Sequence, residues 1–435
     1  MFGFTMKVYG CQMNQYDADK VRTALIARGA RETAEEEADA IIFVGCSIRD
    51  KAEHKVWSEL GYYGTRWAQE RRPVVAVTGC IAQNVGADMA RRYPWVRVVS
   101  GPRHIGFLPE AIEAALLTGK RIMNLDSDPR ELHELAFAPL VRQYPWKASV
   151  MISHGCDNFC TYCIVPYVRG RFASRRPEEI IKEVSQLVQS GVKEISLLGQ
   201  NVDTYGKDLH GYSFAKLLCD VAQIEGLKRL RFMTSYPTDF TQDVVDAIAS
   251  HHVICPAINL PIQAGSDRIL KAMNRRYTVE EYASVVKIIR DHLPEVGLTS
   301  DLIVGFPGET EEDFEMSLQA LQRFRFDLVH TAAYSPRQGT PAAKMKEQVP
   351  EQVKNRRLNE VNDLQTRIAR DINEKLVGHR YEVLVDGKAL KGNLLQGRNQ
   401  TDKVILFEGP VELKGSFVTV EIVSADSWSL KGKLV

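Results

Sequence analysis

The sequence predicts an α/β protein in three parts: an N-terminal doubly wound parallel sheet, a central partial (βα)6 barrel and a small C-terminal β-barrel. In residues 1–125, short apolar runs alternate with helical patterns, which is typical of a parallel sheet covered by helices. Between residues 147 and 372 about six strand-like runs recur, fewer than the eight of a complete barrel. Residues 373–435 change to short alternating strands separated by turn residues, which favours a small barrel.

Length and composition agree with this division. A chain of 435 residues is long enough for about three domains. A content of 44% hydrophobic and 26% charged residues is typical of globular proteins, and a net charge of +1 restricts any nucleic-acid surface to a local patch. We find neither a signal-peptide pattern nor a run of about 18 apolar residues, and therefore expect a cytoplasmic protein without membrane contact.

In the N-terminal part, one cysteine follows each of the first three expected strands. The expected strands are residues 6–9, 40–44, 74–77 and 96–99, with helices at 16–28 and from about residue 50. The cysteines are Cys11, Cys46 and Cys80. Because the carboxyl ends of parallel strands share one edge, these thiols are expected to meet and to hold a cluster. The alternative is three unrelated buried cysteines, since free cysteine is often buried.

A segment rich in proline and charge, residues 126–146, is the expected linker to the barrel. The expected barrel strands are residues 148–152, 194–198, 230–233, 257–260, 298–304 and 327–330. Polar or glycine-rich loops follow several of them, at the end of a barrel where its chemistry takes place.

The loop after the first barrel strand contains Cys156, Cys160 and Cys163 in a C-x3-C-x2-C run. A cubane cluster held by three thiolates keeps one iron open, and an open iron can bind a substrate. A zinc site would need a fourth ligand, for which His154 is the near candidate. Eight cysteines in 435 residues do not form the framework of a disulfide-stapled protein.

The C-terminal part has turn signals at residues 386–387, 397–399 and 408–410, with five short strands expected between and beyond them. Small barrels of this kind often bind RNA. Basic and acidic residues nearly balance in this part, so charge does not separate an RNA-binding barrel from a structural one.

Tyr162, directly before the last cysteine of the loop, completes the signature of the radical S-adenosylmethionine (SAM) enzymes. With this loop, the three N-terminal cysteines and the tail, the whole chain resembles the radical SAM methylthiotransferase family, and the tail resembles its TRAM module. Further matching segments are residues 9–14 (YGCQMN), 46–53 (CSIRDKAE), 165–170 (VPYVRG), 198–202 (LGQNV) and 304–310 (VGFPGET). Gln12 and Met13 are typical of the MiaB-type branch, whereas the sister branches carry Gly-Cys-Lys-x-Asn.

The resemblance implies two 4Fe–4S clusters, one SAM-binding on Cys156, Cys160 and Cys163, and one auxiliary on the N-terminal cysteines. It implies addition of a methylthio group to carbon 2 of N(6)-dimethylallyladenosine, 3′ of the tRNA anticodon. One SAM would methylate cluster-bound sulfur, and a second would yield the radical that removes hydrogen. The sister branches modify threonylcarbamoyl-adenosine or a ribosomal-protein aspartate. An alternative of another class is an iron–sulfur electron carrier or scaffold without catalysis.

Several other residues are candidates for the site. By resemblance Tyr162 lies beside the adenine of SAM, although an ordinary core tyrosine would give the same pattern. Polar residues at the ends of barrel strands are candidates for SAM's polar groups, or merely cap loops: Gln200, Ser235, Gln263 and Asp301. Asn14 and Arg49 flank the auxiliary cluster and are candidates to orient sulfur or substrate; the alternatives are a turn residue and a solvated charge.

Basic residues follow two of the barrel loops and are expected to bind tRNA phosphates, with a solvated helix face as the alternative. They are Arg169, Arg171, Arg175 and Arg176, and Arg268, Lys271, Arg275 and Arg276. The expected partners are tRNA, an electron donor such as a flavodoxin or ferredoxin, and a sulfur donor. We expect the protein to act as a monomer.

The cysteine pattern leads to a prediction about metal content. Protein reconstituted anaerobically should bind about eight irons, from two four-iron clusters. Replacing Cys156, Cys160 and Cys163 together with alanine should leave about half of that iron, measured by iron and sulfide analysis. Stoichiometric zinc without sulfide in the parent protein would contradict the prediction.

Overall fold

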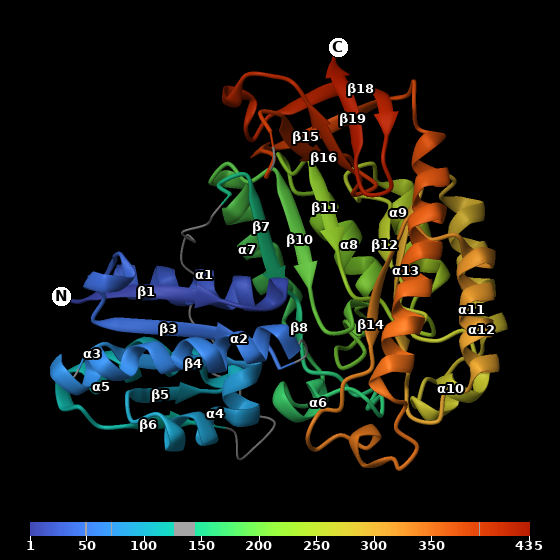
Figure 1. Ribbon diagram of the computed structural model, residues 1–435. Helices are drawn as coiled ribbons and strands as arrows, with labels where there is room; N and C mark the ends of the chain where they lie inside the picture. Colours follow the sequence, from blue (N-terminus) through green and yellow to red (C-terminus); the bar gives the residue numbers. More distant parts are fainter. Residues whose placement is uncertain (48–49, 71, 126–143, 391) are drawn as a thin grey trace.

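The computed structural model describes residues 1–47, 50–70, 72–125, 144–390 and 392–435 (Figure 1). Most of the expected linker, residues 126–146, lies outside the described residues, as does Arg49. No helix in the described part of the chain is both long and apolar enough to cross a membrane.

The N-terminal part is a parallel sheet of six strands in the order β2-β1-β3-β4-β5-β6. The strands are β1 (Gly3–Val8), β2 (Arg31–Glu32), β3 (Ala40–Gly45), β4 (Val74–Gly79), β5 (Val96–Ser100) and β6 (Ile122–Asn124). The edge strands β2 and β6 were not expected from the sequence, because two or three residues are too few to show a period.

Helices cover both faces of this sheet, so the expected doubly wound arrangement is confirmed. The helices are α1 (Gln12–Ala27), α2 (Asp50–Leu60), α3 (Gly64–Glu70), α4 (Cys80–Arg92) and α5 (Leu108–Thr118). Successive strand residues point to opposite faces. Ile42 and Val44 therefore pack in the core beneath α1 and α5, whereas Ile41 and Phe43 pack beneath α2 and α4.

The central part is a partial barrel of six parallel strands, as the sequence predicts. The strands are β7 (Lys147–Met151), β10 (Glu194–Leu198), β11 (Arg229–Phe232), β12 (Ala257–Asn259), β13 (Gly297–Val304) and β14 (Leu328–Ala333). A single bridge between Leu230 and Ile254 joins the β7-β10-β11 half to the β12-β13-β14 half. In the described residues β7 and β14 do not pair, so the barrel is open there.

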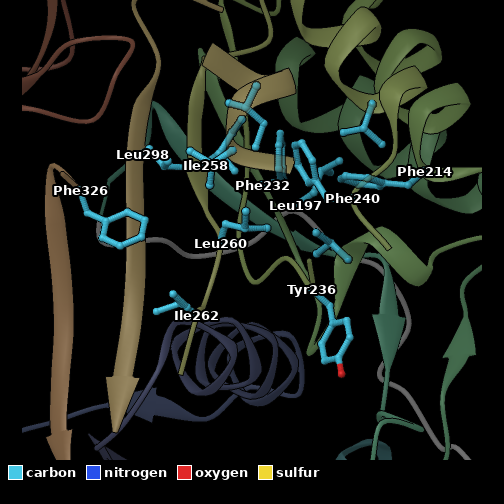
Figure 2. Close-up of a cluster of buried hydrophobic side chains, with 14 of the residues drawn as sticks. Leu197, Phe214, Phe232, Tyr236, Phe240, Ile258, Leu260, Ile262, Leu298 and Phe326 are labelled. Atoms are coloured by element: carbon cyan, nitrogen blue, oxygen red, sulfur yellow. The ribbon is translucent and has the colours of Figure 1, made fainter. Parts of the chain in front are cut away.

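An outer layer of helices and an apolar interior complete the barrel. The helices are α7 (Pro177–Gln189), α8 (Phe214–Ala222), α9 (Gln242–Ser250), α10 (Asp267–Ala272), α11 (Val279–His292), α12 (Glu311–Phe324) and α13 (Glu351–Glu374). Figure 2 shows part of the interior, including Leu197, Phe232 and Ile258 from three neighbouring strands. In the same view the Tyr236 ring lies at the edge of the cluster, and its hydroxyl points away from it.

The C-terminal part is a closed barrel of five strands in the order β15-β16-β17-β19-β18, which confirms the small barrel. The strands are β15 (Arg380–Lys388), β16 (Leu395–Arg398), β17 (Val404–Phe407), β18 (Phe417–Ala425) and β19 (Leu430–Leu434). Its interior is apolar, with Val383, Ile405 and Phe407 fully or almost fully buried. Closure of the barrel pairs the strand edges.

Two buried arginines of β11 attach this small barrel to the amino end of the central barrel. The Arg229 guanidinium donates to the carbonyl oxygens of Arg398 at 2.7 Å and Glu382 at 2.8 Å. The Arg231 guanidinium donates to the carbonyl oxygen of Asn399 at 2.6 Å. The C-terminal barrel therefore lies at the top in Figure 1, opposite the end at which the strands of the central barrel terminate.

Replacing Arg229 with methionine should loosen this attachment. Two carbonyl groups in partly buried hydrogen bonds would lose their charged donor, which costs about 1–3 kcal/mol. We expect a lower thermal midpoint and faster release of a C-terminal fragment by limited proteolysis. Arg380→Met is the matched control, because Arg380 lies in the same small barrel but is exposed and paired at the surface with Glu421. Equal proteolysis of both variants would contradict the docking role.

Candidate metal centre

The three N-terminal cysteines lie at the carboxyl edge of the sheet. Cys11 is the N-cap of α1, Cys46 directly follows β3, and Cys80 opens α4 directly after β4. Gly45 and Gly79 are register partners in β3 and β4, so the two cysteines that follow them leave the sheet from paired positions. The parallel register therefore brings these thiols to one edge.

Close backbone packing brings the first cysteine loop against the second. Gly10 has φ of 136°, and a Cβ built there would lie 2.5 Å from the Cβ of Cys46. Glycine is required because a side chain would displace Cys46. Asn14 is fully buried; its amide donates to the Tyr9 carbonyl at 3.0 Å, and its oxygen accepts from the Cys11 thiol at 3.7 Å. Asn14 thus fixes the loop that carries Cys11.

Charge around this first group favours thiolate. A hydrogen bond from Cys46, with a further contribution from the Arg169 charge, lowers the pKa of Cys11 to about 5 despite its burial. Burial raises the pKa of Cys80. The Arg169 Nε donates to the Cys80 sulfur at 3.2 Å, and its Nη2 forms an ion pair with Asp17 at 3.3 Å. A buried cation that interacts with Cys80 and Cys11 stabilises the thiolate forms of these cysteines.

The second group lies in the loop between β8 (Ser153–His154) and the short helix α6 (Val165–Val168). The backbone N–H of Cys156 donates to the Gly170 carbonyl at 3.2 Å, and that of Cys163 to the Cys160 carbonyl at 2.9 Å. The Gly170 carbonyl precedes β9 (Ala173–Ser174), which pairs with β8. The loop is therefore held as a fixed turn.

A neighbouring segment supports this turn from the other side. Thr161 donates from its backbone N–H to the Met273 carbonyl and from its hydroxyl to the Ala272 carbonyl, both at 2.9 Å. The Asn274 amide donates to the carbonyl oxygens of Asn158 at 3.2 Å and Phe159 at 3.0 Å. The loop after α10 thus holds the second cysteine group in place.

The residues of the second group fit a cluster with an open iron. Burial, with repulsion from Cys160, raises the pKa of Cys156 to about 11 and that of Cys163 to about 12. Buried thiols of this kind become thiolates when they bind metal. The Arg275 guanidinium donates to the sulfur of the remaining cysteine of the group, Cys160, at 3.5 Å. Three soft donors beside a buried cation match the ligand chemistry of iron–sulfur clusters.

Among the described residues, no three or more His, Cys, Asp or Glu side chains are arranged to share a single metal ion. His154, the possible fourth zinc ligand, is buried but completes no such group. Thiols that do not share one ion can bind separate metal atoms. The corners of a cluster provide such separate atoms.

Gln200, Ser235 and Gln263 follow barrel strands at the carboxyl end of the central barrel, whereas Asp301, which was also expected at a strand end, lies within β13. The side-chain oxygen of Gln200, after β10, is buried and lacks a hydrogen-bond partner in the described structure. Gln263 has φ of 68°, and its backbone N–H donates to the Asp301 carbonyl at 2.9 Å. Asp301 lies inside β13 and accepts from the Asn259 amide at 3.1 Å. Tyr162 packs partly buried against the barrel core.

Sequence reasoning missed two buried polar residues at this end. Asp203 accepts from the Tyr236 N–H at 2.9 Å and from the Ser235 hydroxyl at 3.2 Å, and burial raises its pKa to about 8. Asn201 donates to Asp239 at 2.7 Å, while its own oxygen is buried without a partner in the described residues. The polar run at 200–203 directly after a strand was the available signal.

Asp17 was also missed. It is buried and forms an ion pair with Arg169. Cys11, Asn14 and Asp17 recur at intervals of three residues, so they share one face of α1. Polar residues three and six positions after a cysteine were the available signal in the sequence.

The expected phosphate-binding residues are divided by their burial. Arg169 and Arg275 are buried, with 3% and 9% exposure, where a nucleic-acid backbone does not reach. Arg175 is largely buried, forms an ion pair with Glu183 at 2.8 Å and donates to the Met151 carbonyl at 2.6 Å. Exposed positions are held by Arg171, Arg176, Arg268, Lys271 and Arg276.

Known sequence families match all three parts of the chain. The radical SAM superfamily matches residues 150–321, the uncharacterized protein family UPF0004 matches residues 3–101, and the TRAM domain matches residues 374–435. The matches fall on the central barrel, the N-terminal sheet and the C-terminal barrel, respectively.

Similar proteins extend over nearly the whole chain. The tRNA-2-methylthio-N(6)-dimethylallyladenosine synthase of Carboxydothermus hydrogenoformans is 43% identical over 98% of this chain and 98% of its own length. The enzyme of the same name from Moorella thermoacetica is 45% identical over 99% of this chain and 98% of its own length.

Solved structures share the fold at low sequence identity. The radical S-adenosylmethionine methyltransferase TsrM from Kitasatospora setae, with cobalamin and a 4Fe–4S cluster bound, has a TM-score of 0.57 at 14% identity; the match covers 78% of this chain and 73% of TsrM. The cobalamin-dependent S-adenosylmethionine radical enzyme OxsB has a TM-score of 0.51 at 11% identity, covering 84% of this chain and 56% of OxsB.

The raised pKa of Asp203 gives the protein a testable pH dependence. The folded state keeps this proton up to about pH 8, whereas the unfolded chain releases it near its ordinary value of 3.8. Between these values the free energy of unfolding should fall with rising pH, by up to about 1.4 kcal/mol per pH unit from this group. Asp203→Asn should flatten the dependence, measured as the thermal midpoint at pH 5, 6, 7 and 8.

Asp291→Asn is the matched control, since Asp291 is an exposed carboxylate on α11. Its midpoint should follow that of the parent at every pH. A parent and an Asp203→Asn variant with parallel pH profiles would show that Asp203 is ionised in the folded protein.

Proposed function

Because the chain belongs to the radical SAM family that includes the tRNA-2-methylthio-N(6)-dimethylallyladenosine synthases, we propose that it performs their reaction. It adds a methylthio group to carbon 2 of N(6)-dimethylallyladenosine, 3′ of the tRNA anticodon. The observation that supports the proposal is the short chain segment that links the two cysteine groups. Cys163 of the second group and Arg169, which binds Cys80 of the first, are separated by α6 alone.

The alternatives are less well supported. The relatives are enzymes that act on an adenosine of tRNA, which favours that substrate over a ribosomal-protein aspartate. An electron carrier or scaffold would not require buried, unpartnered oxygens at the carboxyl end of the barrel, and Gln200 and Asn201 carry such oxygens. No observation favours threonylcarbamoyl-adenosine.

We assign a SAM-binding 4Fe–4S cluster to Cys156, Cys160 and Cys163, and an auxiliary 4Fe–4S cluster to Cys11, Cys46 and Cys80. When bound, the two clusters supply reductive cleavage of SAM and a site for the sulfur to be transferred. The protein's task is to ionise the thiols, which Arg169 and Arg275 favour by contacting one sulfur in each group.

The barrel loops bind and orient SAM in this proposal. The unpartnered side-chain oxygens of Gln200 and Asn201 would accept hydrogen bonds from its amino groups, since a buried oxygen without a donor is costly. Asp203 holds the Ser235 hydroxyl in position. Tyr162, which packs against the barrel core, would lie beside the adenine, and the apolar barrel interior would keep water from the reacting atoms. Gln263 and Asp301 complete the pocket, and Asn14 orients the loop of Cys11.

The proposed reaction requires three partners: tRNA, an electron donor and a sulfur donor. The TRAM domain supports RNA binding, and its attachment at the far end of the central barrel means that one tRNA must span the barrel to reach both ends. Exposed Arg171, Arg176 and Arg276 lie along the loops at the cysteine end. An electron donor such as a flavodoxin or ferredoxin and a separate sulfur donor are required. We place the reaction in the cytoplasm, with a monomer as the active unit.

Deleting the gene should remove the 2-methylthio group from tRNA, leaving N(6)-dimethylallyladenosine, as measured by mass spectrometry of nucleosides.

Purified protein with Cys11, Cys46 and Cys80 replaced by alanine should still release 5′-deoxyadenosine from SAM with dithionite, because its barrel is intact, but should form no methylthio product. The alanine variant of Cys156, Cys160 and Cys163 should release no 5′-deoxyadenosine. Full methylthio transfer without the three N-terminal thiols would refute the assignment.

A further inference from the structure

Each cysteine group has one buried arginine that donates to one of its sulfurs. Arg169 Nε lies 3.2 Å from the Cys80 sulfur, and Arg275 Nη1 lies 3.5 Å from the Cys160 sulfur. The two arginines come from different segments, the end of α6 and the loop after α10, and both are buried. The structure therefore repeats the same contact at two separate sites.

Arg275 forms no ion pair with a carboxylate among the described residues. Its other contacts are neutral: Nη2 donates to the Pro261 carbonyl at 3.1 Å and Nε to the Tyr277 hydroxyl at 2.9 Å. Its guanidinium carbon lies 4.1 Å from the centre of the Tyr236 ring. A buried cation surrounded by neutral groups is costly, so this position calls for an anion. The Cys160 sulfur is the one contact that can supply it.

Arg169, unlike Arg275, has a carboxylate partner as well as a sulfur partner within the described part of the chain. Its partner Asp17 supplies one negative charge, and the second contact of the guanidinium is the Cys80 sulfur. Ile164 and Val168 pack on Cys80 and exclude water from this contact. In such a dry environment a positive charge next to sulfur has a larger electrostatic effect than it would in water.

Reduction adds one electron from an external donor to an iron–sulfur cluster and makes it more negative by one charge. Hydrogen bonds to the sulfurs and nearby positive charge stabilise the added electron and raise the reduction potential. Resting on the two clusters of the proposed function, we propose that Arg169 raises the potential of the auxiliary cluster and Arg275 that of the SAM-binding cluster. Each arginine acts as a positioning and tuning residue for its own cluster.

The test is a crossed redox titration of the full-length protein, followed by electron paramagnetic resonance with dithionite as reductant. To observe one cluster at a time, the auxiliary cluster is measured in the Cys156, Cys160 and Cys163 alanine background. The SAM-binding cluster is measured in the Cys11, Cys46 and Cys80 alanine background. Iron is counted in every sample before titration.

Arg169→Met should lower the potential of the auxiliary cluster so that the ratio of reduced to oxidised cluster falls at least tenfold at a given solution potential. For one electron this is a shift of about 59 mV. Arg169→Lys keeps the positive charge and should therefore shift the potential of the auxiliary cluster less than Arg169→Met does. Arg275→Met should give the same fall for the SAM-binding cluster, and neither change should move the other cluster.

Arg231→Met is the matched control. It removes another buried arginine, which contacts Glu194 and the C-terminal barrel and neither cysteine group. Both potentials should stay at their parent values in this variant.

Three results would overturn the inference. The first is an unchanged potential with iron retained in Arg169→Met and Arg275→Met. The second is an equal shift of the reduction potentials of both clusters by either variant, which would indicate a general change in the folded structure. The third is loss of iron from Arg169→Lys as well as Arg169→Met, which would make the arginine an assembly residue. If the two triple-alanine proteins with both arginines intact contain no iron, the proposed clusters themselves are wrong. This inference then fails together with the proposed function.

Discussion

The contact of Arg169 with Cys80 and Asp17 is the constraint on which the joint arrangement of the two cysteine groups depends. Arg169 belongs to the central barrel, whereas Cys80 and Asp17 belong to the N-terminal sheet and its first helix. Ile164 and Val168, on the segment between Cys163 and Arg169, pack against Cys80. One short segment therefore places both groups, and the N-terminal part cannot move away without exposing a buried ion pair.

The two ends of the central barrel carry different features. Loops at the carboxyl end of its strands hold the second cysteine group and unpartnered polar atoms, as Gln200 and Asn201 show. At the amino end, Arg229 and Arg231 instead satisfy backbone carbonyls of the small C-terminal barrel. The second cysteine group and the C-terminal barrel thus occupy opposite ends of the central barrel, so that changes at one end need not disturb the other.

Two non-glycine residues in loops near the cysteines and at the end of a barrel strand have positive φ angles. Phe159, between two cysteines of the second group, has φ of 47°, and Gln263 has φ of 68°. Non-glycine residues in this region cost free energy and persist where surrounding contacts hold them. Asn274 holds the Phe159 carbonyl, and the β13 backbone at Asp301 and Ile303 holds Gln263. Phe159 thus shapes the loop of the second cysteine group, and Gln263 the end of a barrel strand.

Much of the architecture is readable from the sequence. The expected strand at 194–198 coincides with β10, because a continuous apolar run between turn signals is a local pattern. The grouping of the cysteines followed from the same logic, since Cys46 and Cys80 each directly follow a strand. The edge strand β2, of two exposed residues, was invisible because it has no period of its own.

The sequence by itself determined the element types, the three-part division and the positions of the six cysteines, because these depend on spacing along the chain. Only the tertiary structure decided that Arg169 and Arg275 lie against sulfur rather than on the surface, and that Asp17 is the counter-charge of Arg169. It also decided on which end of the central barrel the C-terminal barrel docks. The physical reason is that a charged side chain has no local signal for its partner: Arg169 and Asp17 are 152 positions apart, and packing alone brings them together.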